Sequence, residues 1–173
     1  KITALHCHTT ADHGAFDACA DPPKFPAGFM NICTGSYDIP TAYLAVDGIY
    51  TNKAPGGVAY RCSFRVTEAA YFIERMIEVL AIKLNMDAAE LRSKNFIKKE
   101  QFPYQSALGW EYDSGDYHTG WEKALKAVGY EDLRKEQAER VEAFKRGETR
   151  KLLGIGLSHF TEIVGAGPVK NCD

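Results

Sequence analysis

One short stretch of the sequence brings several chemically capable residues together. Two glycines open the segment 56–65, GGVAYRCSFR, in which Cys62 lies between Arg61 and Arg65. The glycine pair lets the backbone come close to a ligand. A predicted helix follows directly, and its free N–H groups together with the two guanidinium groups would stabilise a thiolate. A thiolate is a soft ligand suited to Cu(I), but free cysteine is also often an inert core residue, so both interpretations stay open.

Other reactive side chains have simpler interpretations. His6, Cys7 and His8 look like a metal cluster, but strand alternation places Cys7 opposite the two histidines. His13 is expected in a core or hydrogen-bonded role. Glu162 ends an apolar strand-like segment, which would raise its pKa, and we interpret it as a paired structural carboxylate.

Two further polar or glycine-rich stretches are predicted to carry no chemistry. A solvated polar turn is expected at Tyr112, Asp113, Asp116 and Tyr117. The glycine pairs at 154/156 and 165/167 do not open a helix after a strand, as a dinucleotide-binding fingerprint requires. We interpret both glycine pairs as turns, bulges or close backbone approaches.

The composition bounds the class of protein. The 173 residues predict about one domain, and 21 basic against 23 acidic residues give a net charge of −2. That balance lacks the basic excess typical of proteins that bind nucleic acids or anionic membranes. No apolar run approaches the roughly 18 residues of a membrane span. Five irregularly spaced cysteines without a CxxC pair indicate neither a disulfide framework nor structural zinc, which favours a reducing compartment.

The elements that must position these residues fall into three regions. Residues 1–65 are rich in glycine, proline, aromatic and β-branched residues, residues 66–147 are mainly helical, and residues 151–164 return to strand-like sequence. We expect strands at 1–10 and 41–51, a loop at 21–26, and helices at 66–84, 87–96, 119–128 and 131–146. Because the chain begins at Lys1 within strand-like sequence, we expect an internal piece of a longer protein. The predicted fold class is α+β, a single partial domain over 1–173 with helices packed on the strand-rich first half.

Local signals refine the helices. Asp87 and Thr119 are the predicted N-caps, each followed three residues later by a glutamate, and Gly129 is a C-terminal stop. In the helix 66–84 the apolar residues share one face, and Glu74 and Glu78 are placed on the others. The charged helix 131–146 is predicted to lie on the surface.

The octapeptide 58–65, VAYRCSFR, resembles one specific active-site loop. It is similar to that of the large, molybdenum-binding subunits of aerobic copper-containing carbon monoxide dehydrogenases, within the xanthine dehydrogenase and aldehyde oxidase family. The resemblance extends along nearly the whole chain, including residues 14–40, 95–104 and 154–173. The wider family shares Thr51-Asn52 followed by Ala59-Tyr60-Arg61, whereas Cys62-Ser63-Phe64 distinguishes the carbon monoxide dehydrogenases. The resemblance implies a fragment of the molybdopterin-binding domain.

The resemblance also implies a site and its cofactors. Cys62 would bind Cu(I), which a sulfide would bridge to molybdenum held by molybdopterin cytosine dinucleotide, and carbon monoxide and water would become carbon dioxide, two protons and two electrons. The implied catalytic residues are Arg61, Cys62, Ser63, Phe64 and Arg65, and those beside the cofactor are Gly57, Ala59 and Tyr60.

Partners follow from the same resemblance. An iron–sulfur subunit and an FAD subunit would complete a heterotrimer that pairs with a second one, in the cytoplasm and at the inner face of the cell membrane through its partners. Two alternatives remain: a related molybdenum hydroxylase of aldehydes or N-heterocycles in which Cys62 is structural, and an inactive structural module. The second applies to the isolated fragment, because the family's other cofactor-contacting segments and its glutamate base do not match residues of this chain.

Overall fold

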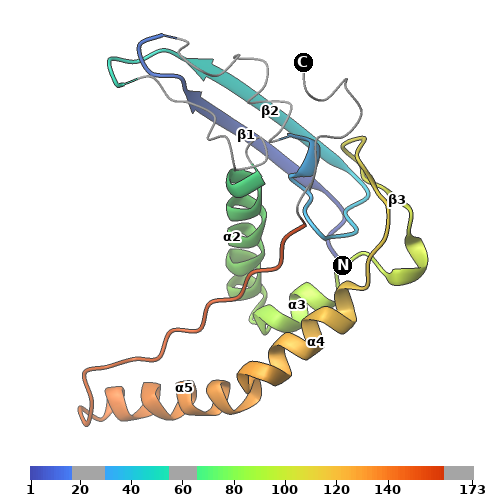
Figure 1. Ribbon diagram of the computed structural model, residues 1–173. Helices are drawn as coiled ribbons and strands as arrows, with labels where there is room; N and C mark the ends of the chain where they lie inside the picture. Colours follow the sequence, from blue (N-terminus) through green and yellow to red (C-terminus); the bar gives the residue numbers. More distant parts are fainter. Residues whose placement is uncertain (17–29, 55–65, 162–173) are drawn as a thin grey trace.

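The computed structural model describes residues 1–16, 30–54 and 66–161 (Figure 1). Strand β1 (Leu5–Asp12) pairs in parallel with β2 (Ala42–Ile49), with Leu5 opposite Ala42 and Asp12 opposite Ile49. Both strands were predicted, although β1 begins four residues later than the sequence pattern suggested. The predicted loop 21–26 and the glycines at 165 and 167 lie outside the described residues.

Helices and short strands make up most of the remaining described chain. The helix α2 (Val66–Leu84) begins and ends where its apolar spacing predicts. The other elements are α3 (Ala88–Ser93), the 3-10 turn η1 (Lys99–Gln101), the antiparallel pair β3 (Tyr104–Gln105) and β4 (Glu111–Tyr112), α4 (Tyr117–Val128) and α5 (Tyr130–Lys145). Figure 1 shows α2 running from the β1–β2 sheet to a layer of α3, α4 and α5. This mixture confirms the α+β expectation.

Two apolar clusters hold these layers together. The first joins α2 to the sheet and is formed by Cys7, Ile32, Cys33 and Ala69. The second joins α2 to α3 and α4, and its buried members are Leu5, Tyr37, Ile39, Ile73, Ile77, Ala81, Ala89, Leu91, Phe96 and Trp121. Positions 69, 73, 77 and 81 recur every four residues, so one stripe of α2 serves both clusters.

Capping residues decide where the shorter helices begin and end. The Asp87 carboxylate accepts from the N–H groups of Ala89 (2.8 Å) and Glu90 (3.2 Å), which confirms it as the N-cap of α3. Gly129 has φ +67° and ends α4, also as predicted. The expectation for Thr119 is wrong. Asp116 is the N-cap of α4, because its carboxylate accepts from the Thr119 N–H at 3.2 Å.

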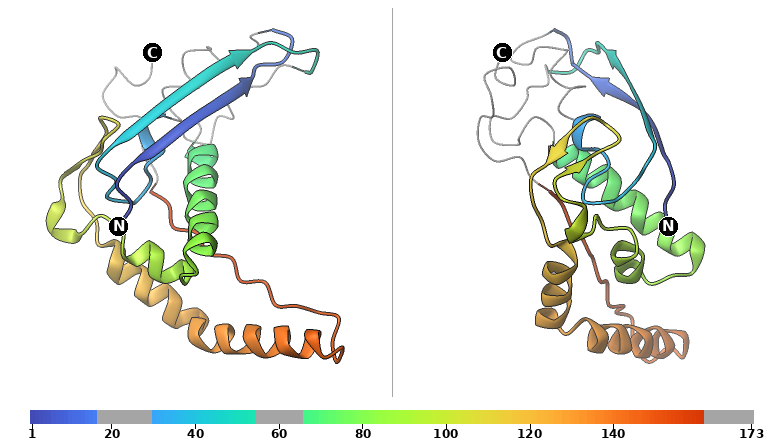
Figure 2. Two further views of the ribbon diagram at one scale, coloured as in Figure 1. Left: turned by 180° about the vertical axis from the view of Figure 1, so that it is seen from behind. Right: turned by 90° about the vertical axis from the view of Figure 1, so that its right-hand side faces the viewer.

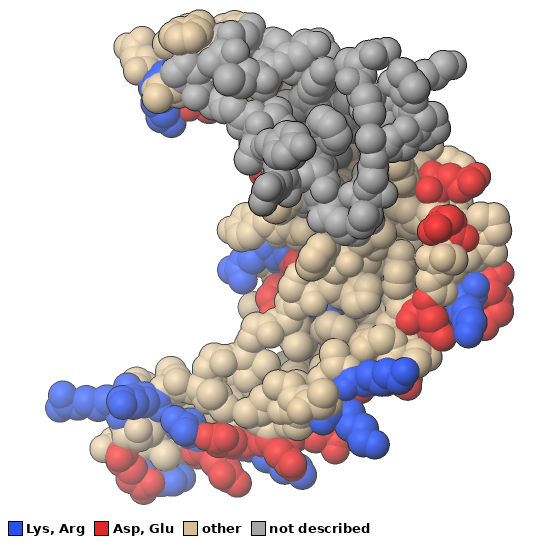
Figure 3. All heavy atoms as spheres, in the orientation of Figure 1, with Lys and Arg blue, Asp and Glu red and all other residues tan. Residues whose placement is uncertain are grey.

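The helix α5 lies on the surface, as its charge pattern predicted. It has no buried residue, and Figure 3 shows acidic and basic side chains side by side along it. Within the described ranges no helix is long and apolar enough to cross a membrane.

Residues 151–161 correct the prediction of a strand at 151–164. This segment runs back from the end of α5 past α2, as Figures 1 and 2 show, but it forms no ladder with another described strand. Residues 162–164 lie outside the described residues. The sequence has the alternation of a strand, and only a neighbouring strand in the right place can turn that alternation into a sheet.

Candidate cofactor loop and its scaffold

The loop that the sequence singles out lies outside the described residues, so its residue roles stay predictions. This holds for Gly57, Ala59, Tyr60, Arg61, Cys62, Ser63, Phe64 and Arg65, and also for Glu162. The structure does describe both ends of the loop. They are residues 50–54 before it and Val66 after it.

The end before the loop is tied to the end of β1. The Thr51 N–H donates to the Gly14 carbonyl at 2.8 Å, and the Ala15 N–H donates to the Lys53 carbonyl at 3.0 Å. Asp12 adds side-chain contacts, because its carboxylate accepts from the Thr51 hydroxyl (2.7 Å) and pairs with the Lys53 ammonium (2.8 Å). These bonds, above all the one from Lys53, lower the pKa of Asp12 to about 2. The approach to the loop is therefore fixed by backbone and side-chain contacts together.

The end after the loop is the N-terminus of a long helix. Because α2 begins at Val66, its unpaired N–H groups and its positive dipole end come directly after Arg65. This confirms the predicted helix after residue 65, whose free N–H groups would help to stabilise a thiolate at Cys62. Cys7 and Cys33 offer a contrast, because both are buried and burial raises the pKa of each thiol. Of these three thiols, only Cys62 has arginines as close sequence neighbours, and a permanent positive charge favours the thiolate that a soft metal needs.

A buried ion pair fixes α2 in the molecule. Glu74 is only 6% exposed and Arg92 is fully buried, and their Oε2 and Nε atoms are 2.9 Å apart. Arg92 also donates to Glu78 at 3.2 Å, and the Tyr37 hydroxyl donates to Glu74. Burial and the Glu74 charge raise the pKa of Tyr37. The expectation that Glu74 lies on an outer face of its helix is therefore wrong, because a partner 18 positions away compensates its charge inside the protein.

His159 extends this polar cluster. Its Nδ1 is 3.0 Å from the Ser36 hydroxyl, which is 2.7 Å from the Thr161 hydroxyl, and Thr161 donates to the Tyr117 hydroxyl at 3.0 Å. The imidazole ring lies 4.6 Å from the Phe96 ring between centroids. Burial, and then the charge of Arg92, lower the pKa of His159. Sequence reasoning missed this residue, since no local pattern connects it with positions 36 and 92.

The histidines near the N-terminus do not assemble a metal site. Cys7 is buried while His6 and His8 are exposed, which confirms that they lie on opposite faces of β1, and His8 pairs with Asp47 at 2.7 Å. His13 is half-buried, with its ring 6.0 Å from that of Tyr50. In the described part of the chain, no group of three or more His, Cys, Asp or Glu residues could hold a metal ion.

The predicted solvated turn is wrong for its two tyrosines. Tyr112 is 5% exposed, and its hydroxyl donates to the Gly35 carbonyl at 3.0 Å. Burial raises its pKa. Tyr117 is half-buried, whereas Asp113 and Asp116 are exposed as expected. Burial removes the apolar area of both rings from water, and each hydroxyl keeps a hydrogen-bond partner inside the protein.

Known proteins resemble this chain both in sequence and in structure. The carbon monoxide dehydrogenase large chain of Afipia carboxidovorans is 72% identical over all 173 residues, and that of Hydrogenophaga pseudoflava is 66% identical over the same length. A crystal structure of the Cu,Mo-CO dehydrogenase in a carbon monoxide reduced state superposes with a TM-score of 0.92 at 71% identity. It covers 99% of this chain, and this chain covers 22% of it.

The chain spans about a fifth of the length of the curated relatives it matches, 21% in each case. Within it, residues 1–96 match the family described as the molybdopterin cofactor-binding domain. That match covers more than half of the chain and includes both described ends of the loop. The chain belongs to the molybdopterin cofactor-binding domain family.

Proposed function

We propose that the chain is part of the catalytic large subunit of an aerobic carbon monoxide dehydrogenase. The net reaction is the oxidation of carbon monoxide with water to carbon dioxide, two protons and two electrons. The observation that carries the proposal is the 72% identity over all 173 residues to a carbon monoxide dehydrogenase large chain. The cysteine, serine and phenylalanine at 62–64 add the sequence feature by which this enzyme differs from its relatives.

Cys62 is the residue that would hold copper. Its thiolate is a soft donor matched to Cu(I), and the N-terminus of α2 with Arg61 and Arg65 favours the deprotonated form. When bound, a copper–sulfide–molybdenum centre on molybdopterin cytosine dinucleotide supplies the capture of carbon monoxide and the acceptance of its two electrons. One similar enzyme bears both metals in its name, Cu,Mo-CO dehydrogenase.

The remaining loop residues would shape the site around that ligand. Ser63 and Phe64 would form the wall beside the copper, and Arg65 would anchor the loop electrostatically. Gly57, Ala59 and Tyr60 would lie beside the cofactor, where the glycine would let the backbone approach it closely. The Asp12–Lys53 ion pair lies before the loop and α2 begins directly after it, so the scaffold holds the described residues on both sides.

We further propose the surroundings of this subunit. An iron–sulfur subunit would carry electrons away and an FAD subunit would pass them on, in a dimer of heterotrimers. The assembly would work in the cytoplasm, at the inner face of the cell membrane through its partners.

The proposal is tested by metal analysis of the complex that contains the parent subunit, with Cys62→Ser and with Cys7→Ser as the matched control. Cys62→Ser is expected to lose copper and to retain molybdenum. Carbon monoxide oxidation should fall by more than about 100-fold, since even outer partners of metal ligands cost about 10–100-fold. Cys7→Ser removes a buried thiol from β1 and should leave copper unchanged.

Two results would contradict the proposal at different points. Unchanged copper and activity in Cys62→Ser would make Cys62 structural. The other result is a wild-type complex that oxidises aldehydes or N-heterocycles but not carbon monoxide, with copper lost in Cys62→Ser. It would keep Cys62 as the copper ligand and replace the proposed substrate.

A further inference from the structure

Residues 151–161, which we call the strap, have the exposure pattern of a β-strand. The even-numbered residues from 152 to 160 are exposed, and the odd-numbered residues from 153 to 161 are half-buried. Leu157 packs against the larger apolar cluster, and His159 lies against Phe96. No described strand forms a ladder with the strap. Among the described residues, side chains are what contact its backbone.

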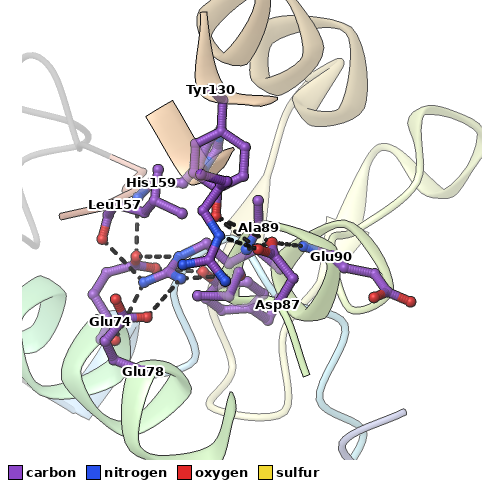
Figure 4. Close-up of polar contacts among 12 residues, drawn as sticks. Glu74, Glu78, Asp87, Ala89, Glu90, Tyr130, Leu157 and His159 are labelled. Atoms are coloured by element: carbon purple, nitrogen blue, oxygen red, sulfur yellow. Dashed lines mark hydrogen bonds and ion pairs between the residues drawn. The ribbon is translucent and has the colours of Figure 1, made fainter. Parts of the chain in front are cut away.

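Side chains contact the strap backbone at the positions where a neighbouring strand would. The Arg92 Nη2 donates to the Leu157 carbonyl at 3.0 Å, and the His159 N–H donates to the Glu74 Oε2 at 3.0 Å. Figure 4 shows Leu157 and His159 facing Glu74. In an extended chain, the carbonyl of one residue and the N–H two positions later point to the same side.

This arrangement reproduces one step of a parallel β-ladder. In such a ladder, a residue of the neighbouring strand donates its N–H to one carbonyl and accepts from the N–H two residues later. Here Arg92 supplies the donor and Glu74 the acceptor, on either side of Ser158. An ion pair thus takes the place of a single strand residue.

We propose that the Arg92–Glu74 pair is a register lock that fixes the strap along the body of the protein. A shift of the strap by one residue would turn both backbone groups away from the pair. A shift by two would restore the polarity but move Leu157 out of the apolar cluster and His159 away from Phe96. The ion pair and the apolar packing together allow only one register of the strap.

The pair is fully committed to this arrangement. All five N–H bonds of the Arg92 guanidinium have acceptors, namely the side chains of Glu74 and Glu78 and the carbonyls of Glu74, Ala88 and Leu157. Glu74 accepts from Tyr37, Arg92 and His159. Buried ion pairs add little net stability compared with apolar residues of similar size. This pair fixes the position of the strap through hydrogen bonds to its backbone, which an apolar pair cannot make.

The test replaces the polar core by an apolar one in the intact complex that contains the parent subunit. The triple variant Tyr37→Phe, Glu74→Leu, Arg92→Met removes the charges and leaves no orphaned partner among these three side chains. The measurement is hydrogen–deuterium exchange read by mass spectrometry. In the triple variant, the amide protection of residues 155–161 is expected to fall by about tenfold or more, while residues 73–81 in α2 keep their protection. Gln137→Ala is the matched control, because it removes a different side-chain bond to the strap, at the Leu153 carbonyl.

Two outcomes would overturn the register lock. One is unchanged protection in 155–161 of the triple variant. The other is an equal loss in the strap and in α2, which would make the pair a general stabiliser. If the triple variant fails to assemble, Arg92→Lys decides by the same comparison, since an ammonium keeps the charge but cannot reach all five acceptors.

Discussion

At the scale of single residues, the described chain concentrates its buried polarity around Glu74, Arg92 and His159. Each of these side chains carries a polar or charged group into the interior and finds partners there. An unpaired charge in the same place would be strongly destabilising. Their burial therefore depends on all partners being present together.

His159 should make the stability of the parent subunit depend on pH. Its pKa is lowered in the folded state from the ordinary value of 6.5, so the unfolded chain binds more protons below that value. Stability is thus complete above about pH 6.5 and falls as the pH drops toward the folded pKa. His159→Asn should weaken this dependence, as measured by thermal unfolding at about pH 7.5 and about pH 5.5.

The control for this prediction is His6→Asn, which changes an exposed ring on the outer face of β1. It should retain the acid sensitivity of the wild type. Equal losses of stability on acidification in the wild type and His159→Asn would show that the ring does not contribute.

At the scale of elements, the start of α4 separates two candidate caps. Sequence spacing favours Thr119, whereas the structure places Asp116 outside the first turn with its carboxylate on the Thr119 N–H. Asp116 also pairs with Lys99 at 3.3 Å, which ties η1 to α4. Asp116 thus joins η1 to α4 and also marks the start of α4.

Asp116→Ala is expected to cost about 1 kcal/mol of unfolding free energy, because an unpaired N–H remains at the helix start. Thr119→Ala should stay within about 0.5 kcal/mol, since its side chain is exposed. Denaturant unfolding of the parent subunit measures both. The reverse order of the two costs would restore Thr119 as the cap.

At the scale of the whole molecule, Phe96 is the point where distant segments meet. Its ring stacks on Tyr37 at 5.4 Å between centroids and contacts Trp121 at 5.8 Å and His159 at 4.6 Å. These rings come from the chain before α2, from α4 and from the strap. A single side chain therefore links three segments that are far apart in the sequence.

Phe96→Ala should cost about 3–5 kcal/mol, because a buried aromatic ring leaves a cavity that its neighbours fill only in part. Phe144→Ala, at a side chain 48% exposed on α5, should change stability by less than about 0.5 kcal/mol. Urea unfolding followed by fluorescence gives the unfolding free energy of each variant and tests this difference. A small effect of Phe96→Ala would mean that these three segments are held together without its ring.

The sequence by itself determined the features that depend on near neighbours along the chain. The bounds of α2, the Asp87 cap and the Gly129 stop all follow from spacings of a few residues. The candidate metal ligand Cys62 and the family also follow from the sequence, since one octapeptide carries the distinguishing motif.

Only the tertiary structure decided which polar groups are buried and what holds the strap. Glu74 and Arg92 are 18 residues apart, and Arg92 and Leu157 are 65 apart, so no local pattern shows that they meet. The strap alternates like a strand but takes its backbone partners from side chains. Periodicity fixes which face of a segment is buried, whereas its partner is fixed by whatever the rest of the fold brings alongside.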